Sequence, residues 1–364
     1  MGDASNATES PEAPKATGST ESPGPEGPSG PTHLTIGGGG CSGFEYIGIM
    51  HGLQLSGRSA SIRNVVGISI GAFFGALFAM DADMSWVRRS FEALARTPGY
   101  LQVPASHLLL LPSRYCLFDV DRLIEPFVRA LQLRWPDVEP GSITLHSFCE
   151  RIGRRFAVIL TELNTSRSIV ATPEGTLGDC SIVDILRASM SLPFVLKPML
   201  IGPIGSIGPT ANARESQRRV YVDGGLTCDH PWFAFSGYAL TADASAPPPK
   251  PEDVLDLRID LTSCNPTTFE TPLKSAVHYV TSLFQCTLWN KSAYLLERKC
   301  QNRIVVTSAV MPLLPIRLTS RGFNVDITAD KVAQAYVHGM ALYEAYADKN
   351  ATCSNKPILA TDKR

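Results

Sequence analysis

Two glycine-rich turns near the N-terminus carry residues that could perform acyl transfer. The first is Gly37–Gly43 (GGGGCSG), and the second is Gly67–Gly71 (GISIG). Each turn follows a short apolar run and leads into a helical pattern. The unobstructed backbone N–H groups of the first turn could stabilise an oxyanion. The second turn has the Gly-x-Ser-x-Gly pattern, which holds a serine hydroxyl, here that of Ser69, on a sharp strand-to-helix corner.

A serine hydroxyl is a weak nucleophile near neutral pH and needs a base close by. The best candidate is Asp223, which ends the apolar run Val220–Val222 and precedes Gly224 and Gly225. These two glycines would let the chain turn abruptly and hold the carboxylate at the C-terminal edge of a sheet, where open α/β sheets place ligands. A solvated Asp-Gly-Gly turn is the alternative interpretation.

The elements around these turns predict an α/β fold. A strand at His33–Ile36 precedes a helix at Phe44–Leu55. A second strand at Ile62–Val66 then leads through the serine corner into a second helix at Ala72–Met80. Strands and helices then alternate, which is typical of a mainly parallel sheet covered on both faces. The further strands are expected at Arg155–Leu160, Ser168–Thr172, Arg219–Val222, Leu255–Leu261 and Ile304–Ala309, and the helices at Ile182–Ser189, Pro272–Glu297 and Ala329–Ala347.

Composition excludes several classes of protein. The chain has 364 residues, 44% of them hydrophobic, which is enough for a large globular core. The 33 Lys and Arg residues against 34 Asp and Glu residues give a net charge of −1, so nucleic acid is not an expected partner. The nine cysteines include no C-x-x-C pair and indicate reduced thiols inside a cell. No cluster of ligating side chains suggests a metal, and we expect no cofactor.

Shifts in composition suggest four regions. Residues 1–31 are rich in Pro, Ser and Gly and should be disordered, because they cannot bury a core. A catalytic core is expected over residues 32–240, a C-terminal α/β part packed on the same domain over 241–348, and a polar tail over 349–364. The chain shows neither a secretory signal nor a run of about 18 apolar residues. We therefore expect an intracellular, cytoplasmic protein whose membrane contact is peripheral.

The glycine turns also admit other interpretations. Gly38-x-Gly40-x-x-Gly43 satisfies the dinucleotide fingerprint, but no acidic residue follows about 20 positions later to bind a ribose. Cys41 is a rival nucleophile, because a thiol at a helix N-terminus can have a lowered pKa.

Two apolar segments bear on the substrate. We interpret Leu108–Leu111 as an ordinary buried segment, with a lid or a lipid-facing surface as the alternative. The segment Ser189–Phe194 is expected to line an acyl pocket, including the hydroxyls of Ser189 and Ser191.

Together these motifs resemble those of the patatin-like phospholipases. The resemblance covers about residues 34–240 and rests on motifs in the family order, namely Gly38–Gly43, Ile47–Ile49, Gly67–Gly71, Ala188–Pro193 and Asp223–Gly225. It implies a three-layer patatin-like fold with a mainly parallel central sheet flanked by helices. It also implies a lipid acyl hydrolase of the phospholipase A type, which requires no metal and acts on phospholipids or other acyl lipids.

The resemblance also implies roles for individual residues. Ser69 and Asp223 would form a catalytic dyad without histidine. The oxyanion hole would be formed by Gly38, Gly39, Gly40 and Gly43. The nucleophile elbow would need Gly67 and Gly71, and the turn after the base would need Gly224 and Gly225. One position departs from the pattern: the family usually has Arg or Lys where this chain has Ser42, which leaves the charge beside the oxyanion hole open.

Two other functions are compatible with the same motifs. An α/β-hydrolase-type esterase or thioesterase would use a triad of Ser69, Asp223 and either His278 or His338. That fold places several βα units before its elbow, whereas only one fits between Leu34 and Ser69. A catalytically silent, lipid-binding relative would keep the fold without the activity. The sequence indicates no oligomeric state.

Overall fold

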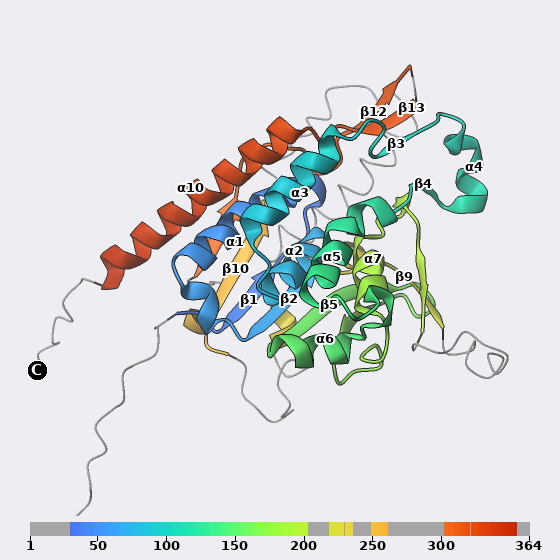
Figure 1. The fold of residues 1–364 in the computed structure, drawn as a ribbon. Helices are drawn as coiled ribbons and strands as arrows, with labels where there is room; N and C mark the ends of the chain where they lie inside the picture. The colour runs from blue at the N-terminus through green and yellow to red at the C-terminus, as the bar shows by residue number, and fades with distance from the viewer. Residues whose placement is uncertain are drawn as a thin grey trace, which may run out of the picture.

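The computed structural model describes residues 30–202, 218–228, 230–235, 249–260, 302–320 and 322–354. Its centre is an eight-stranded sheet (Figure 1). The strands of this sheet are β1 (His33–Ile36), β2 (Asn64–Ile68), β5 (Arg155–Glu162), β6 (Arg167–Ala171), β8 (Met199–Ile201), β9 (Arg219–Asp223), β10 (Val254–Ile259) and β11 (Arg303–Val306). Their order is β11-β10-β1-β2-β5-β9-β8, and β6 also pairs with β5.

Strands β11, β10, β1, β2 and β5 are parallel to one another, whereas β6, β8 and β9 join through antiparallel pairing. This confirms the expected α/β class with a mainly parallel sheet. The α-helices are α1 (Glu45–Leu55), α2 (Ile70–Ala79), α3 (Met84–Arg96), α4 (His107–Arg114), α5 (Asp121–Arg134), α6 (Leu145–Ile152), α7 (Ile182–Met190) and α10 (Ala329–Ser354).

Short elements complete the described fold. Two small sheets are formed by β3 (Gln102–Val103), β12 (Ile316–Thr319) and β13 (Gly322–Val325), and by β4 (Cys116–Phe118) and β7 (Phe194–Leu196). The 3-10 turns are η1 (Gly40–Phe44), η2 (Arg58–Ser61), η3 (Pro140–Ser142), η6 (Gly224–Leu226), η7 (Pro231–Phe235) and η8 (Pro251–Asp253).

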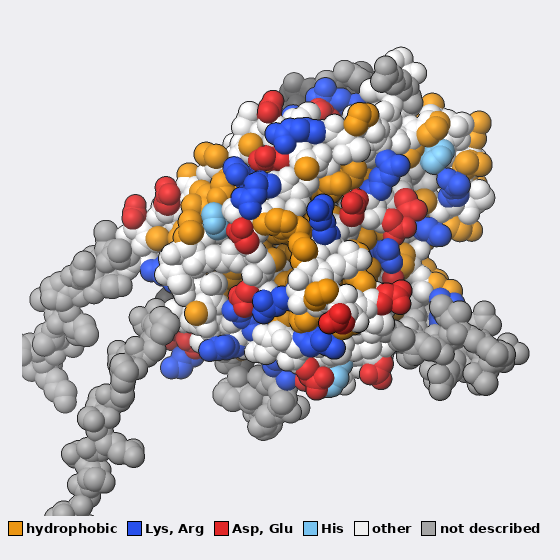
Figure 2. All heavy atoms as spheres, viewed as in Figure 1, with side chains coloured by type: hydrophobic (Ala, Val, Ile, Leu, Met, Phe, Trp, Pro, Cys, Tyr) orange, Lys and Arg blue, Asp and Glu red, His pale blue; other side chains and the backbone are white. Residues whose placement is uncertain are grey.

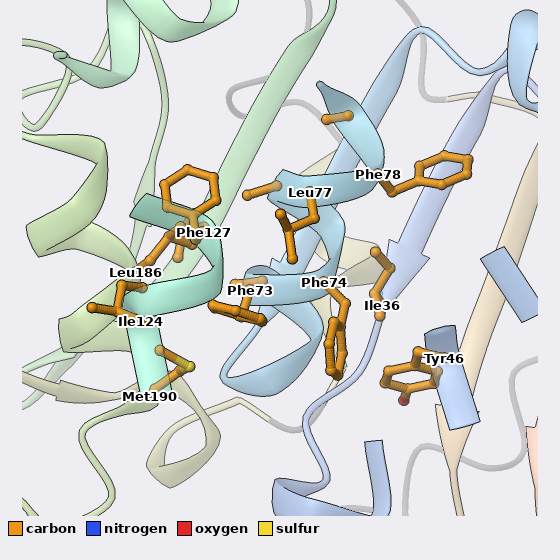
Figure 3. Packing of buried hydrophobic residues seen from close by; sticks show 14 of the residues in the cluster. Ile36, Tyr46, Phe73, Phe74, Leu77, Phe78, Ile124, Phe127, Leu186 and Met190 are labelled. Carbon is orange, nitrogen blue, oxygen red and sulfur yellow. The ribbon is translucent and has the colours of Figure 1, made fainter. Parts of the chain in front are cut away.

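The main core lies between the sheet and helix α2. Figure 3 shows aromatic side chains of α2 between Ile36 of β1 and Phe127 of α5. Phe73 and Phe74 of α2 are fully buried and meet edge to face, with ring centroids 5.3 Å apart. Because α2 is apolar on every side, it requires neighbours all round, and the sheet, α5 and α7 supply them.

The opposite face of the sheet carries a second, smaller core. Val66, Ile68 and Ile159 pack there against Cys228 and Phe235, which belong to the segment after β9. Both faces of the sheet are therefore covered within the described residues. The expected helix Pro272–Glu297 lies outside them.

The part of the chain beyond residue 240 contributes to the same sheet, because β10 and β11 extend it from β1. Helix α10 lies along α1 (Figure 1). The two helices touch at glycines: a Cβ on Gly48 would collide with the Tyr336 carbonyl, and a Cβ on Gly339 would collide with the Glu45 carbonyl. The absence of side chains at these two positions sets the spacing of the helices.

The interpretation of Leu108–Leu111 as a buried segment was wrong. These residues lie on α4, where Leu109 is 83% exposed and Leu108 and Leu110 are 42% and 41% exposed. Helix α4 stands at the edge of the molecule, beside β4 (Figure 1). Within the described parts of the chain, no helix combines the length and apolar character that a membrane span requires.

We predict that Gly339→Ala lowers stability, although alanine favours helices over glycine by about 1 kcal/mol. The added methyl group would press on the Glu45 carbonyl, and such overpacking costs roughly 1–3 kcal/mol. Urea unfolding measures the change, with Ala345→Val on the exposed side of α10 as the control for an added side chain. An unchanged or raised midpoint for Gly339→Ala would show that the two helices can separate without cost.

Candidate active site

Ser69 occupies a strained corner between β2 and α2. Its φ of 54° is in the left-handed region, which residues other than glycine seldom adopt. A Cβ on Gly67 would lie 2.5 Å from Ala72 Cα, and a Cβ on Gly71 would collide with the Gly37 carbonyl. Both positions therefore require glycine because the backbone passes so close. The corner holds the Ser69 side chain at the carboxyl end of the parallel strands.

Ser69 and Asp223 meet although 154 positions separate them. The Ser69 Oγ donates a hydrogen bond to Asp223 Oδ2 at 2.6 Å, a length typical of a hydroxyl that binds a carboxylate. The second carboxylate oxygen, Oδ1, accepts a hydrogen bond from the Gly225 amide at 2.8 Å. Strand β9 runs antiparallel to β5 and brings Asp223 opposite Leu160, so β9 ends beside the corner.

Burial makes Asp223 a stronger base than an ordinary aspartate. Its side chain is almost completely buried, and the residue is 4% exposed. This desolvation raises the pKa of Asp223 to about 6, and the hydrogen bonds from Ser69 and Gly225 oppose that rise. Near neutral pH the carboxylate is ionised and ready to accept the Ser69 proton.

Two buried serines near the end of α7 hold the pair in place. Ser189 Oγ accepts a hydrogen bond from the Ser69 amide at 2.9 Å and donates one to the Ile159 carbonyl at 2.8 Å. The Ser191 carbonyl accepts a hydrogen bond from the Asp223 amide at 3.0 Å. The expectation that these two hydroxyls line an acyl pocket was wrong, because both serines are fully buried and absent from the cavity wall.

The glycine turn lies against Ser69. A Cβ on Gly38 would be 3.5 Å from Ser69 Cβ, and the Gly38 and Gly39 amides donate to no acceptor within the described residues. Gly40 has a positive φ and also lines the cavity. Gly43 is placed differently: it lies in η1 against Ile70 and is not part of the described cavity wall.

Ser42 faces away from the cavity. It is fully buried, and its hydroxyl donates a hydrogen bond to the Met311 carbonyl at 2.8 Å. The neighbouring Cys41 amide donates to the Leu313 carbonyl. A segment from beyond residue 240 thus secures the glycine turn, and the turn itself carries no charge.

One cavity joins the glycine turn, Ser69 and Asp223. Most of its wall is apolar and comes from helices, from strands of the small sheets and from loops. The apolar residues of this wall include Phe44, Phe73, Phe91, Leu101, Phe118, Leu123, Met190, Leu192, Val195 and Leu196. A serine paired with a carboxylate, free amide groups beside it and an apolar cavity are together suited to acyl transfer.

The rival catalytic residues do not fit this geometry. Cys41 lines the cavity, but burial raises the pKa of its thiol to about 12, which disfavours the alternative of a reactive thiol. His338 lies on α10 with Nδ1 3.7 Å from Glu45 Oε1, away from the described cavity wall. His278 lies outside the described residues.

The histidine of the described cavity wall is His230, which the sequence favours as part of a turn before a helix and not as a catalytic group. A His-Pro pair in an irregular segment carries little signal. For metals, the described residues contain no group of three or more His, Cys, Asp or Glu side chains placed to hold an ion.

A sequence model of the patatin-like phospholipases matches residues 34–235 of this chain. No curated protein sequence matches it significantly. Among solved structures, VipD from Legionella pneumophila is 14% identical, with a TM-score of 0.43 over 88% of this chain and 67% of that chain. A chain of the ExoU–SpcU heterodimer of the Pseudomonas aeruginosa type III secretion system is 16% identical and has a TM-score of 0.34. The match covers 89% of this chain and 61% of that chain.

Human GIVD cytosolic phospholipase A2 is 17% identical, with a TM-score of 0.24 over 40% of this chain and 23% of that chain. This chain therefore spans only part of the length of each of these three proteins.

The raised pKa of Asp223 predicts how the reactivity of Ser69 depends on pH. Only the ionised carboxylate can accept the serine proton, so labelling of Ser69 by a neutral fluorophosphonate should slow tenfold per pH unit below about 6. Mass spectrometry of the labelled peptide gives the rate, and circular dichroism shows whether the chain is folded at each pH. A labelling rate that is flat between pH 8 and pH 4.5 in folded protein would exclude Asp223 as the base.

Proposed function

Since this chain belongs to the patatin-like phospholipase family, we propose that it is a lipid acyl hydrolase in which Ser69 and Asp223 form the catalytic dyad. The observation that carries this proposal is the 2.6 Å hydrogen bond between the two side chains, at a strained corner beside an apolar cavity. An adjacent base within hydrogen-bond reach is what activates a serine.

The proposed reaction has two steps. Asp223 accepts the proton of Ser69 while Oγ attacks the ester carbonyl, and the amides of Gly38 and Gly39 stabilise the negative charge that develops on the carbonyl oxygen. The alcohol leaves with the proton that Asp223 returns, and Ser69 retains the acyl group. Water then attacks the acyl-enzyme, Asp223 accepts its proton, and the free fatty acid departs when Ser69 is protonated again.

We also propose that a lipid surface meets the protein at an exposed apolar patch, the α4 patch, which consists of Leu108, Leu109, Leu110, Tyr115 and Leu200. Figure 2 shows hydrophobic side chains gathered at the edge of the molecule where α4 stands in Figure 1. All five residues are between 41% and 83% exposed. A contiguous exposed apolar patch is typical of a surface that binds a membrane or a protein.

Charge and position support a membrane as the occupant of the α4 patch. A groove beside it is lined by Arg114, Arg122 and Lys197, and the described part of its wall has a single carboxylate, that of Asp119. Such an excess of positive charge attracts anionic lipid headgroups. Phe118 of β4 lines both this groove and the cavity that contains Ser69. A lipid leaving the membrane at the α4 patch would therefore have a short path to the proposed nucleophile.

Ser69→Ala and Asp223→Asn should each abolish hydrolysis of phospholipid and of a soluble ester, because one removes the nucleophile and the other removes its base. The double variant should be no slower than either single variant, since both side chains serve one step. Ser142→Ala and Asp137→Asn, both at exposed positions, are matched controls and should retain full activity. A single variant that keeps substantial turnover would contradict the dyad.

Leu109→Ser should weaken binding to anionic phospholipid vesicles by about tenfold, because burying a leucine side chain contributes roughly 1.5–3 kcal/mol. Sedimentation with vesicles measures the binding, and the Ser69→Ala background prevents hydrolysis of the lipid. Leu133→Ser on α5 is the control, because Leu133 is 65% exposed but lies outside the α4 patch. Equal losses in the two variants would mean that the α4 patch is not the membrane contact.

A further inference from the structure

The cavity around Ser69 has a polar end on the opposite side of the sheet from its apolar wall. Val254, Asp256 and Arg258 alternate along β10, so they share one face of the sheet. Val254 belongs to the smaller core of that face. Leu257 and Ile259 point to the other face and belong to the main core. Arg258 and Ile259 both line the cavity, which therefore reaches around the edge of the sheet.

Asp256 anchors the polar end. It is fully buried, and its Oδ2 accepts hydrogen bonds from Arg258 Nε at 2.8 Å and from Arg303 Nε at 3.1 Å. Its Oδ1 accepts a hydrogen bond from Thr35 Oγ1 at 2.8 Å. One carboxylate thus faces two guanidinium groups. Of these two, Arg258 belongs to the cavity wall and is the only Lys or Arg that the described wall contains.

The imidazole of His230 lines the same end. It is 8% exposed, and neither ring nitrogen has a hydrogen-bond partner among the described residues, although Nε2 lies 3.3 Å from Asp256 Oδ1. Burial lowers the pKa of His230 to about 4, so the ring is neutral near pH 7. Buried polar groups almost always have partners, and an unsatisfied imidazole in a cavity wall points to a polar group that occupies the space beside it.

We propose that Arg258 and His230 bind the phosphodiester of a glycerophospholipid while its acyl chain lies on the α2 side of the sheet. This inference rests on the proposed function. The glycine turn cannot supply the positive charge, because it carries none and Ser42 is buried against Met311. The hydrogen bond from Arg258 to Asp256 uses Nε, and its Nη donors bind no acceptor among the described residues.

The charge of the polar end narrows the class of ligand. Asp260 also lines the cavity, so the described wall carries one cation, Arg258, and one carboxylate besides Asp223. A carboxylate disfavours the second negative charge of a phosphomonoester and suits the ammonium group of a zwitterionic headgroup. A guanidinium binds a phosphodiester through charge-assisted hydrogen bonds. The site therefore fits a lipid such as phosphatidylcholine or phosphatidylethanolamine better than a neutral acylglycerol.

The test compares two lipids that differ only in the headgroup. Phosphatidylcholine and diacylglycerol with the same acyl chains are presented in identical detergent micelles, and kcat/KM is measured for each. We expect Arg258→Gln to lower the ratio of phosphatidylcholine to diacylglycerol hydrolysis about tenfold or more, because a charge-assisted hydrogen bond is lost. Arg258→Lys should restore part of the ratio.

Arg303→Gln is the matched control. It removes the other guanidinium from Asp256, but Arg303 is not part of the described cavity wall, so the ratio should not change. A similar fall in the ratio for Arg303→Gln would overturn the proposal, because the effect would then come from disruption of Asp256. Arg258→Gln with an unchanged ratio would overturn it as well.

A binding measurement separates this proposal from the proposed function. Calorimetry with a water-soluble, short-chain phosphatidylcholine compares Ser69→Ala with the Ser69→Ala/Arg258→Gln double variant. We expect at least tenfold weaker binding by the double variant, whether or not the natural chain hydrolyses the lipid. Equal affinities of the two variants would overturn the headgroup site even if Ser69 proves to be the nucleophile. If Arg258 contributes to binding but the natural chain does not hydrolyse the lipid, only the proposed function is overturned.

Discussion

The hydrogen bond between Ser69 and Asp223 is the constraint on which the rest of this structure depends. It needs a donor on the corner after β2 and an acceptor at the end of β9, brought within 2.6 Å of each other. The donor can reach its place only with a positive φ, which costs of order 1–3 kcal/mol in a residue other than glycine. Packing of the elements before and after the corner must offset that strain. The apolar helix α2, which follows the corner, contributes to this packing.

Helix α7 connects Ser69 with Asp223 through packing and hydrogen bonds. It packs on α2, β5 and β9, and near its end Ser189 and Ser191 bind the backbone of Ser69 and of Asp223. The Ser189 hydroxyl also binds the carbonyl of Ile159 on the strand that lies between β2 and β9. The small Ser189 hydroxyl suits this task because it satisfies the backbone of Ser69 and of Ile159 without occupying the cavity.

Local features of the site could be predicted from the sequence, whereas features that depend on distant neighbours could not. The two glycine turns and the strands before them are set by residues within each segment. The antiparallel direction of β9 is not, because a short apolar run that ends in Asp223 fits either direction. The four leucines of α4 show the same limit: their pattern is that of a buried segment, and only the tertiary structure leaves Leu109 exposed.

Helices α3, α4, α5 and α6 were not predicted, and the reasons differ. Prolines lie inside α4 and α5, at Pro112 and Pro126, and obscure the helical pattern. Helix α3 had a usable signal: Asp83 caps it through a hydrogen bond from the Ser85 amide. The role of Gly43 could not be judged from spacing, because one turn of η1 decides that it faces Ile70 instead of the cavity.

Ser69 lies at the carboxyl end of the central strand β2, where the cavity can reach both faces of the sheet, so the two ends of the cavity differ in polarity. Residues that alternate along a strand point to opposite faces, so neighbouring positions of β10 supply Ile259 to one end and Arg258 to the other. The main core makes the first end apolar, and the buried Asp256 holds the second end polar. An ester bond at Ser69 would lie where these two environments meet, which is also where the two parts of an amphipathic lipid join.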